Sequence, residues 1–288
     1  MKVTVLGLGR MGRELVNHII DAGHDVTVWN RSPEACRPAV DRGARQSSSA
    51  AGAVDGAEVV VSVLFGPETV REVVLDGVDT FAPGALWVDV TTIGPADARD
   101  QAAWASERQV RYVQSPVLGT VAPARAGALG VLLGGESLDI AAAREITDLW
   151  ADPERVFELE TAEQAAAGKL AVNLGLAVAM QGLAEAIRVG SSAGLPTRDL
   201  LEIVVKTPLA GIAAAKGETV LSGDYGDAQF TVDALAKDIG LMVDTIRPLP
   251  AAEAVQARLL AAQEAGSGDS DFSVIAQAGP NAESPGRG

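Results

Sequence analysis

The spacing of hydrophobic positions along the chain changes once, close to residue 160. Before that point, short apolar runs rich in β-branched residues alternate with stretches of helical length, which predicts alternating strands and helices. The run from Glu58 to Leu64 is apolar at nearly every position, as expected for a strand buried on both faces of a parallel sheet. After residue 160 we find no strand pattern, and the period is helical.

This order of elements predicts an α/β domain with a doubly wound parallel sheet, followed by an all-α domain. Strands are expected at 3–6, 25–29, 58–64, 85–90, 110–113, 131–133 and 155–159. The helices between them are expected at 13–22, 33–42, 68–74, 96–107 and 137–150. A capping box formed by Thr161 and Gln164 opens a long helix to about residue 193. Further helices are expected at 197–205, 210–219, 228–246 and 251–265.

Length supports two domains, because the chain has 288 residues and one hydrophobic core rarely serves more than about 250. We place the first domain at 1–160 and the helical domain at 161–278. The last residues, 279–288, are rich in Gly, Pro, Ser and Asn and are expected to be disordered.

The first strand runs directly into a glycine motif, Gly7-Leu8-Gly9-Arg10-Met11-Gly12, which opens a helix. Gly7 suits a tight turn, Gly9 allows close approach of a pyrophosphate, and Gly12 allows close packing of helix and strand. A second strand follows within about thirty residues, as a dinucleotide-binding βαβ unit requires. The motif therefore predicts a bound dinucleotide, with its phosphates at the helix N-terminus.

The end of the second strand indicates which dinucleotide is bound. An acidic residue normally holds the ribose 2′-hydroxyl of NAD at this place. Here the residues are Asn30, Arg31 and Ser32. An amide, a guanidinium and a hydroxyl would bind a 2′-phosphate, which a carboxylate would repel. We therefore predict NADP(H), with a solvated surface role for Arg31 as the alternative.

Composition excludes several classes of function. The net charge of −15 argues against nucleic-acid and anionic-membrane partners. The single cysteine, Cys36, rules out an internal disulfide and a cysteine metal cluster, and His18 and His24 lie far from other ligand-type residues, so no metal is expected. The chain begins on a strand without a signal-peptide pattern, and we find no apolar run of about 18 residues. A cytoplasmic protein without a membrane-spanning helix is expected.

Two strand-end loops are expected beside the cofactor, because ligands of such sheets bind at the carboxyl ends of the strands. They contain Leu64-Phe65-Gly66 and Thr91-Thr92, and the segment Gln114–Thr120 forms another strand-end loop.

The long helix carries Lys169 and Asn173 on one face among apolar or small neighbours. A lysine desolvated there would have a lowered pKa, which suits proton transfer. A lysine that reaches the solvent along the helix surface explains the spacing equally well. A second charged pair, Lys237-Asp238, reads more simply as a solvated helix face.

The ordered motifs together resemble the β-hydroxyacid dehydrogenases, the 3-hydroxyisobutyrate dehydrogenase group, over nearly the whole chain. They are the glycine motif, Asp89-Val-Thr-Thr92-Ile-Gly-Pro95, Ser115-Pro-Val-Leu-Gly119, Gly168-Lys169 with Asn173, and Phe230 with Lys237-Asp238. The resemblance implies a Rossmann domain joined by a long helix to a helical domain that forms dimers. It also implies that Lys169 is the catalytic acid and base, that Asn173 and Phe230 contact substrate, and that Leu64, Thr92 and Lys237 contact the cofactor, Lys237 near its nicotinamide end.

The substrate loop departs from the pattern of the family, which usually reads Asp-x-Pro-Val-Ser-Gly-Gly. This chain has Gln114 in place of the aspartate, and Leu118-Gly119-Thr120 in place of Ser-Gly-Gly. A more apolar pocket follows, which favours a bulkier aldehyde, ketone or imine over a small hydroxy acid. An NADPH-dependent carbonyl reductase or dehydrogenase is the first expectation. An imine reductase is the second, although such enzymes usually lack the lysine, and a non-catalytic NADP-binding protein is the third.

Overall fold

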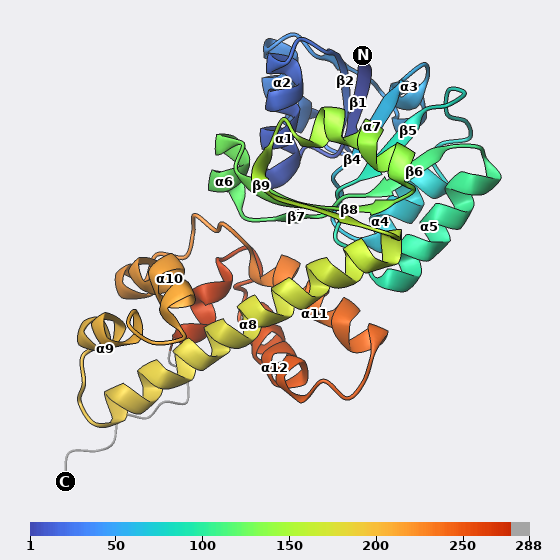
Figure 1. The fold of residues 1–288 in the computed structure, drawn as a ribbon. Coiled ribbons are helices and arrows are strands. Elements are labelled where there is room, and N and C mark those ends of the chain that lie inside the picture. The colour runs from blue at the N-terminus through green and yellow to red at the C-terminus, as the bar shows by residue number, and fades with distance from the viewer. Residues whose placement is uncertain (278–288) are drawn as a thin grey trace. The chain divides into compact units, whose positions relative to one another are not determined.

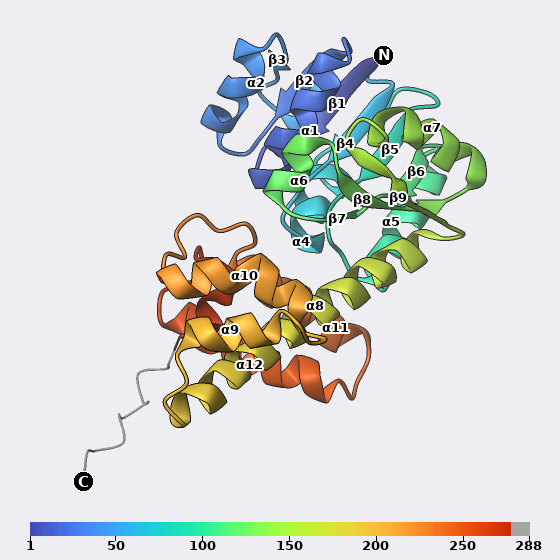
Figure 2. The same cartoon turned by 60° about the vertical axis from the view of Figure 1, so that its left-hand side comes forward.

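The computed structural model describes residues 1–277; the predicted disordered tail at 279–288 lies outside the described residues. The chain forms two compact units, the first from Met1 to Leu170 and the second from Ala171 onward. Figures 1 and 2 show the strands gathered in the first unit and the helices α9 to α12 in the second.

One sheet of nine strands forms the frame of the first unit, in the order β3-β2-β1-β4-β5-β6-β8-β7, with β9 paired to β8. The strands are β1 (Lys2–Leu6), β2 (Asp25–Trp29), β3 (Arg45–Gln46), β4 (Val59–Ser62), β5 (Leu86–Asp89), β6 (Arg111–Gln114), β7 (Val117–Leu118), β8 (Leu129–Gly135) and β9 (Ala151–Leu159).

The expectation of a parallel sheet holds for β1 to β6 and needs correction beyond them. β8 runs antiparallel to both β6 and β7, whereas β9 is parallel to β8. The connection from β6 to β8 does not cross a face of the sheet. It contains β7, which pairs antiparallel with β8, so the chain reverses its direction along the sheet edge.

Helices cover both faces of this sheet. They are α1 (Arg10–Asp21), α2 (Arg37–Asp41), α3 (Ala50–Val54), α4 (Pro67–Val70), α5 (Pro95–Glu107), α6 (Val121–Ala126) and α7 (Ser137–Thr147), with a 3-10 turn at Pro33–Cys36 and a π turn at Arg71–Leu75. The helices predicted at 33–42 and 68–74 are therefore each divided in two. The first one restarts at Arg37 because Pro38, in its first turn, has no amide hydrogen to donate.

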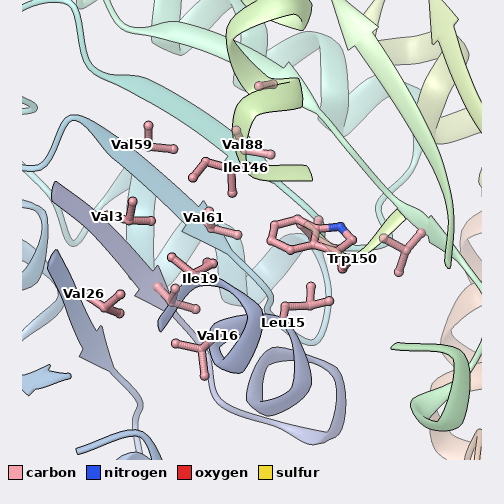
Figure 3. Close-up of a cluster of buried hydrophobic side chains, with 14 of the residues drawn as sticks. Val3, Leu15, Val16, Ile19, Val26, Val59, Val61, Val88, Ile146 and Trp150 are labelled. Atoms are coloured by element: carbon pink, nitrogen blue, oxygen red, sulfur yellow. The ribbon is translucent and has the colours of Figure 1, made fainter. Parts of the chain in front are cut away.

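Alternate residues of the central strands enter two apolar clusters, as the two faces of a strand require. Val59 and Val61 belong to one cluster with α1 and α7, and Val60 belongs to the other with Trp87. Figure 3 shows the first cluster, in which Trp150 and Ile146 meet the α1 side chains Leu15 and Ile19.

The second unit consists of helices: α8 (Ala162–Ser192), α9 (Thr197–Val204), α10 (Ala210–Ser222), α11 (Val232–Thr245) and α12 (Pro250–Glu264), with a 3-10 turn at Phe272–Ala276. The division between the units falls at Leu170, inside α8, whereas the sequence placed it at 160. The first turns of α8 pack against the sheet, since Ala162 and Ala166 belong to the cluster of Trp87.

The predicted capping box forms in a modified way. The Thr161 hydroxyl accepts a hydrogen bond from the amide of Gln164 at 3.3 Å. The Gln164 side chain accepts from the amide of Glu160 at 3.0 Å, one residue earlier than a standard capping box would place it.

By length and composition, α8 could cross a membrane, with a mean hydropathy of 1.5 in its most apolar window, of which 39% is buried. The sequence expectation concerned an uninterrupted apolar run of about 18 residues, and polar residues such as Asn173 and Gln181 interrupt this helix. One such helix is weak support for a membrane protein, because core helices of soluble proteins meet the same criterion.

A buried ion pair lies in the second unit. The ammonium of Lys216, on α10, donates to the carboxylate of Asp271 at 2.7 Å, and both side chains are almost fully buried. Asp271 also accepts hydrogen bonds from the amide of Gln229 and from the amide and hydroxyl of Ser273.

Candidate active site

The glycine turn after β1 has the geometry that the sequence predicted. Gly7 has φ of +98°, and a Cβ there would lie 2.3 Å from the carbonyl oxygen of Val63. A Cβ on Gly12 would lie 2.0 Å from the carbonyl oxygen of Gly7, so helix and turn can meet only at a glycine. Gly9 is different, because nothing lies within 4 Å of the Cβ it lacks. The open face of Gly9, at the N-terminus of α1, fits the approach of a phosphate.

The rest of the motif divides between core and surface. Leu8 is buried, and Met11 packs against the cluster of Leu15. Arg10 is exposed at the start of α1.

Asn30 organises the end of β2. Its side-chain oxygen accepts from the amide of Leu8 at 2.9 Å, and its side-chain nitrogen donates to the carbonyl of Ser32 at 3.0 Å. The Asn30 amide thus joins the glycine turn to the segment after β2. Arg31 and Ser32 are exposed, and no carboxylate among residues 1–277 forms an ion pair with Arg31.

The loops after β4 and β5 meet the glycine turn, as strand topology predicted. A Cβ on Gly7 would lie 3.0 Å from Cδ2 of Leu64. The amide of Leu64 donates to the Thr91 hydroxyl at 3.0 Å, and Thr92, the next residue, is half-buried. The structure thus brings Leu64 and Thr92 to the edge of the sheet that carries the glycine turn.

Lys169 lies against the predicted substrate loop. It is partly buried near the start of α8, and its ammonium donates to the carbonyl oxygen of Val117 at 2.8 Å. Leu118 follows directly, so the first unit itself brings Lys169 and the substrate loop together.

The departures in this loop are each accommodated locally. The Leu118 side chain lies over Gly130. A Cβ built on Gly130 would lie 3.0 Å from the Cβ of Leu118. Gly119 has φ of +143°, a conformation that favours glycine. Thr120 has an extended backbone and precedes the first turn of α6, so a side chain is tolerated there.

The second unit contains the remaining predicted residues. Asn173 is buried on α8, and its side-chain nitrogen donates to the Asp238 carboxylate at 2.6 Å. The Lys237 ammonium lies 2.6 Å from the other oxygen of Asp238, so the interpretation of this pair as a solvated face is wrong. Phe230 packs edge-on against Phe272, with ring centroids 5.9 Å apart.

Sequence reasoning did not place Asp238 in the site, although it joins Asn173 to Lys237. A signal was present, because an acidic residue between Ala236 and Ile239 on an apolar helix needs partners if that face is buried. Gln114, which the sequence showed only as a departure from the family pattern, is the last residue of β6, and its fully buried amide bonds the loop after β5.

Burial is the largest cause of the raised pKa values of two side chains in the first unit. Desolvation raises the pKa of Tyr112 well above its ordinary value, and the charge of Asp89 adds to the effect. Desolvation also raises the pKa of Cys36, against a backbone hydrogen bond with Asn30 that lowers it. Within residues 1–277, no group of three or more His, Cys, Asp or Glu side chains could hold a metal ion.

A cavity of about 330 Å³ lies in the first unit, away from Lys169 and the glycine turn. Its lining includes one basic side chain, Arg71. The acidic side chains of the lining come from α4, α5 and the segment between these helices: Glu68, Glu72, Asp76, Asp97 and Asp100. Burial raises the pKa of Asp97, and the charges of Glu68 and Asp100 add to the rise. This anionic cavity does not suit a phosphate or a carboxylate ligand.

Two family models match consecutive parts of the chain. Residues 2–159 match the family described as the NAD binding domain of 6-phosphogluconate dehydrogenase. Residues 164–278 match the family described as NAD-binding of NADP-dependent 3-hydroxyisobutyrate dehydrogenase. The chain is 31% identical to an NAD-dependent L-serine dehydrogenase of Pseudomonas aeruginosa, over 95% of this chain and 96% of that protein.

Solved structures extend the likeness. The 3-hydroxyisobutyrate dehydrogenase of Mycobacterium tuberculosis, solved with L-serine, matches with a TM-score of 0.85 and 26% identity over 96% of this chain and 97% of that one. An imine reductase from Myxococcus stipitatus with NADP+ matches at a TM-score of 0.66 and 22% identity, over 96% and 98% of the two chains, which shows a shared fold alone. The chain therefore belongs to the 3-hydroxyisobutyrate dehydrogenase family of β-hydroxyacid dehydrogenases, which act on CH–OH groups with NAD(P).

Proposed function

We propose that this protein is an NADPH-dependent oxidoreductase of the β-hydroxyacid or semialdehyde type, in which Lys169 acts as general acid and base. The observation that carries the proposal is the 2.8 Å hydrogen bond between the Lys169 ammonium and the Val117 carbonyl. This bond holds Lys169, the one charged side chain between Ala165 and Ala184 of α8, at the loop where the family binds substrate.

The chain supplies three parts of the reaction. The glycine turn and the N-terminus of α1 bind the phosphates, and the nicotinamide, when bound, gives or accepts the hydride. Lys169 donates a proton to the carbonyl oxygen during reduction and removes one from the hydroxyl during oxidation. The bond to Val117 holds the ammonium at the start of the substrate loop.

Removal of the ammonium tests the catalytic role. Lys169→Ala should lower kcat by about 10²- to 10⁴-fold, the usual contribution of a positioned acid or base. NADPH affinity, measured by fluorescence titration, should change little, because the phosphate sites are untouched. Lys206→Ala, a change at an exposed lysine, is the control. A Lys169→Ala enzyme with near-normal kcat would end the proposal.

NADPH is preferred over NADH in this proposal because exposed Arg31 and Ser32 follow β2 where a carboxylate would serve NADH. Arg31→Glu should raise KM for NADPH by about ten- to a hundredfold, the worth of charged hydrogen bonds to one phosphate. KM for NADH should change far less. Arg198→Glu, with the same change in net charge on exposed α9, should leave both constants unaltered. Equal effects of Arg31→Glu on both cofactors contradict the assignment.

The substrate is proposed to be less polar than a small hydroxy acid, because Leu118 occupies the place of the hydroxyl that the family uses. Initial rates of NADPH oxidation should therefore be higher with semialdehydes and ketones bearing alkyl chains than with short oxo acids. Turnover of cyclic imines without turnover of any carbonyl compound would instead favour an imine reductase. NADPH binding without turnover of either class would favour a non-catalytic protein.

A further inference from the structure

A buried amide joins two of the strand-end loops. Gln114 ends β6 and is fully buried, and its side-chain nitrogen donates to the carbonyl oxygen of Thr91 at 2.8 Å. A carbonyl oxygen only accepts hydrogen bonds, so this contact fixes which end of the amide is the nitrogen. The other end, Oε1, then accepts from the Tyr112 hydroxyl at 2.6 Å.

Thr91 passes this connection to the cofactor side of the site. Its hydroxyl accepts from the amide of Leu64 after β4 at 3.0 Å, and its own amide donates to the carboxylate of Asp89 at 3.1 Å. Asp89 accepts in turn from the Ser62 hydroxyl at 2.7 Å. Through Thr91, the Gln114 amide is therefore linked to the ends of both β4 and β5.

On its other side, Gln114 is joined covalently to the segment that holds Lys169. Ser115 follows it and donates its amide to the Asp89 carbonyl at 2.7 Å. Two residues further on, the Val117 carbonyl accepts from Lys169. Only Ser115 and Pro116 lie between Gln114 and the residue whose carbonyl oxygen contacts the lysine.

We propose that Gln114 is a positioning residue for hydride transfer. Its amide keeps the loops of Leu64 and Thr91 in a fixed relation to the segment of Val117, and so to Lys169. The inference rests on the proposed function of Lys169. A glutamine suits the task because it donates to Thr91 and accepts from Tyr112 at once, whereas an ionised carboxylate could only accept. The effect on rate is large in principle, since a misplacement of about 1 Å can cost about a hundredfold.

Gln114→Glu tests this with little change of shape. It keeps the acceptor for Tyr112 and loses the donor to Thr91 while the new carboxyl is ionised. The matched control is Gln101→Glu, the same amide-to-acid change at a buried residue whose Oε1 lies 2.8 Å from the same Tyr112 hydroxyl. The carboxylates of Asp89, Asp97 and Glu163 act on this region, so both introduced acids should titrate above their ordinary range.

Gln114→Glu should lower kcat about tenfold or more at alkaline pH, where the introduced carboxyl is ionised, and the loss should shrink as the pH falls and the protonated acid regains a donor. Gln101→Glu should keep the kcat of the unaltered enzyme across the same pH range. Thermal melts of the two variants show whether their stability differs. Equal losses of kcat in the two variants, or a normal kcat in Gln114→Glu, would overturn the proposal.

A second measurement needs no substrate. Hydrogen exchange of the Leu64 amide, which bonds the Thr91 hydroxyl, should be at least tenfold faster in Gln114→Glu than in the unaltered protein at alkaline pH, and unchanged in Gln101→Glu. If no substrate turns over, the proposed function fails and this measurement alone decides the coupling. Unchanged exchange at Leu64 would overturn it.

Discussion

The two units of the molecule bury polar side chains in different ways. At the sheet edge of the first unit, the amides of Asn30 and Gln114 and the hydroxyl of Thr91 bond main-chain groups of neighbouring loops. In the second unit, Lys216 pairs with Asp271, and Asp238 joins Lys237 to Asn173.

The difference follows from what each architecture leaves unpaired. Where strands end, main-chain N–H and C=O groups lose their ladder partners, and neutral side chains can satisfy them. Helices satisfy most of their own main chain, so a polar side chain buried between helices finds fewer main-chain partners and relies more on other side chains, as Asp271 does on Lys216. Buried charges of opposite sign then form ion pairs. Removal of one partner destabilises the fold because the other charge stays buried without a partner. The comparison therefore predicts unequal consequences of mutation in the two units.

The largest effect on stability is expected at Lys216. Lys216→Ala should lower the free energy of unfolding of the helical unit by about 3–5 kcal/mol, because Asp271 is left as an uncompensated buried charge. Urea titration followed by far-UV circular dichroism measures it. Lys206→Ala, at an exposed lysine, should stay within about 0.5 kcal/mol. Equal effects of the two changes would show that the ion pair is not what stabilises this region.

A smaller effect, divided between folding and binding, is expected in the glycine turn. Gly12→Ala should lower the free energy of unfolding by about 1–3 kcal/mol, because its methyl group meets the Gly7 carbonyl oxygen. Gly9→Ala should leave the melting temperature unchanged, since its methyl group enters open space, and should weaken NADPH binding about tenfold or more by blocking a phosphate. Melting curves and cofactor titration of both variants decide this. A destabilised Gly9→Ala protein with normal affinity would reverse the roles given to the two glycines.

The smallest effect concerns the ionisation of Asp271. Burial alone would raise the pKa of Asp271, but hydrogen bonds from Lys216 and Ser273 outweigh it and hold the pKa below its ordinary value of 3.8. Between the folded and unfolded pKa values, the folded state binds fewer protons, so stability rises with pH. The stabilisation is complete above the unfolded pKa, about 3.9, and is lost as the pH falls through the lower, folded value.

Unfolding free energies at pH 7 and at pH 3 and below measure this loss. The advantage of the unaltered protein over Asp271→Asn should be greatest at pH 7 and should shrink as the pH falls through the folded pKa. An advantage that grows with acidity would contradict the direction of the shift.

Local rules predicted much of the fold and of the site. The glycine spacing placed the turn at Gly7 and Gly12 correctly because backbone geometry there admits no side chain. The helical period predicted α8 to α12 within a few residues, since each helix buries one apolar stripe. The strand-end rule brought Leu64 to the glycine turn.

What the sequence did not reveal depends on partners distant in the chain. The antiparallel direction of β8 is set by how the chain returns after β7, which periodicity does not record. The sequence predicted Asn30 at the cofactor but did not predict that both ends of its amide also bond the protein's own main chain. Asp238 reads as a surface residue until the burial of Asn173 beside it is known.

The two outer strands have a consequence for behaviour at high concentration. β3 has only two residues, and β9, paired to β8, contains Pro153, Glu154 and Arg155, all exposed. A short edge, a proline and exposed charges each hinder the addition of a strand from another copy. Concentrated stocks should therefore resist the fibrous growth that open sheets invite.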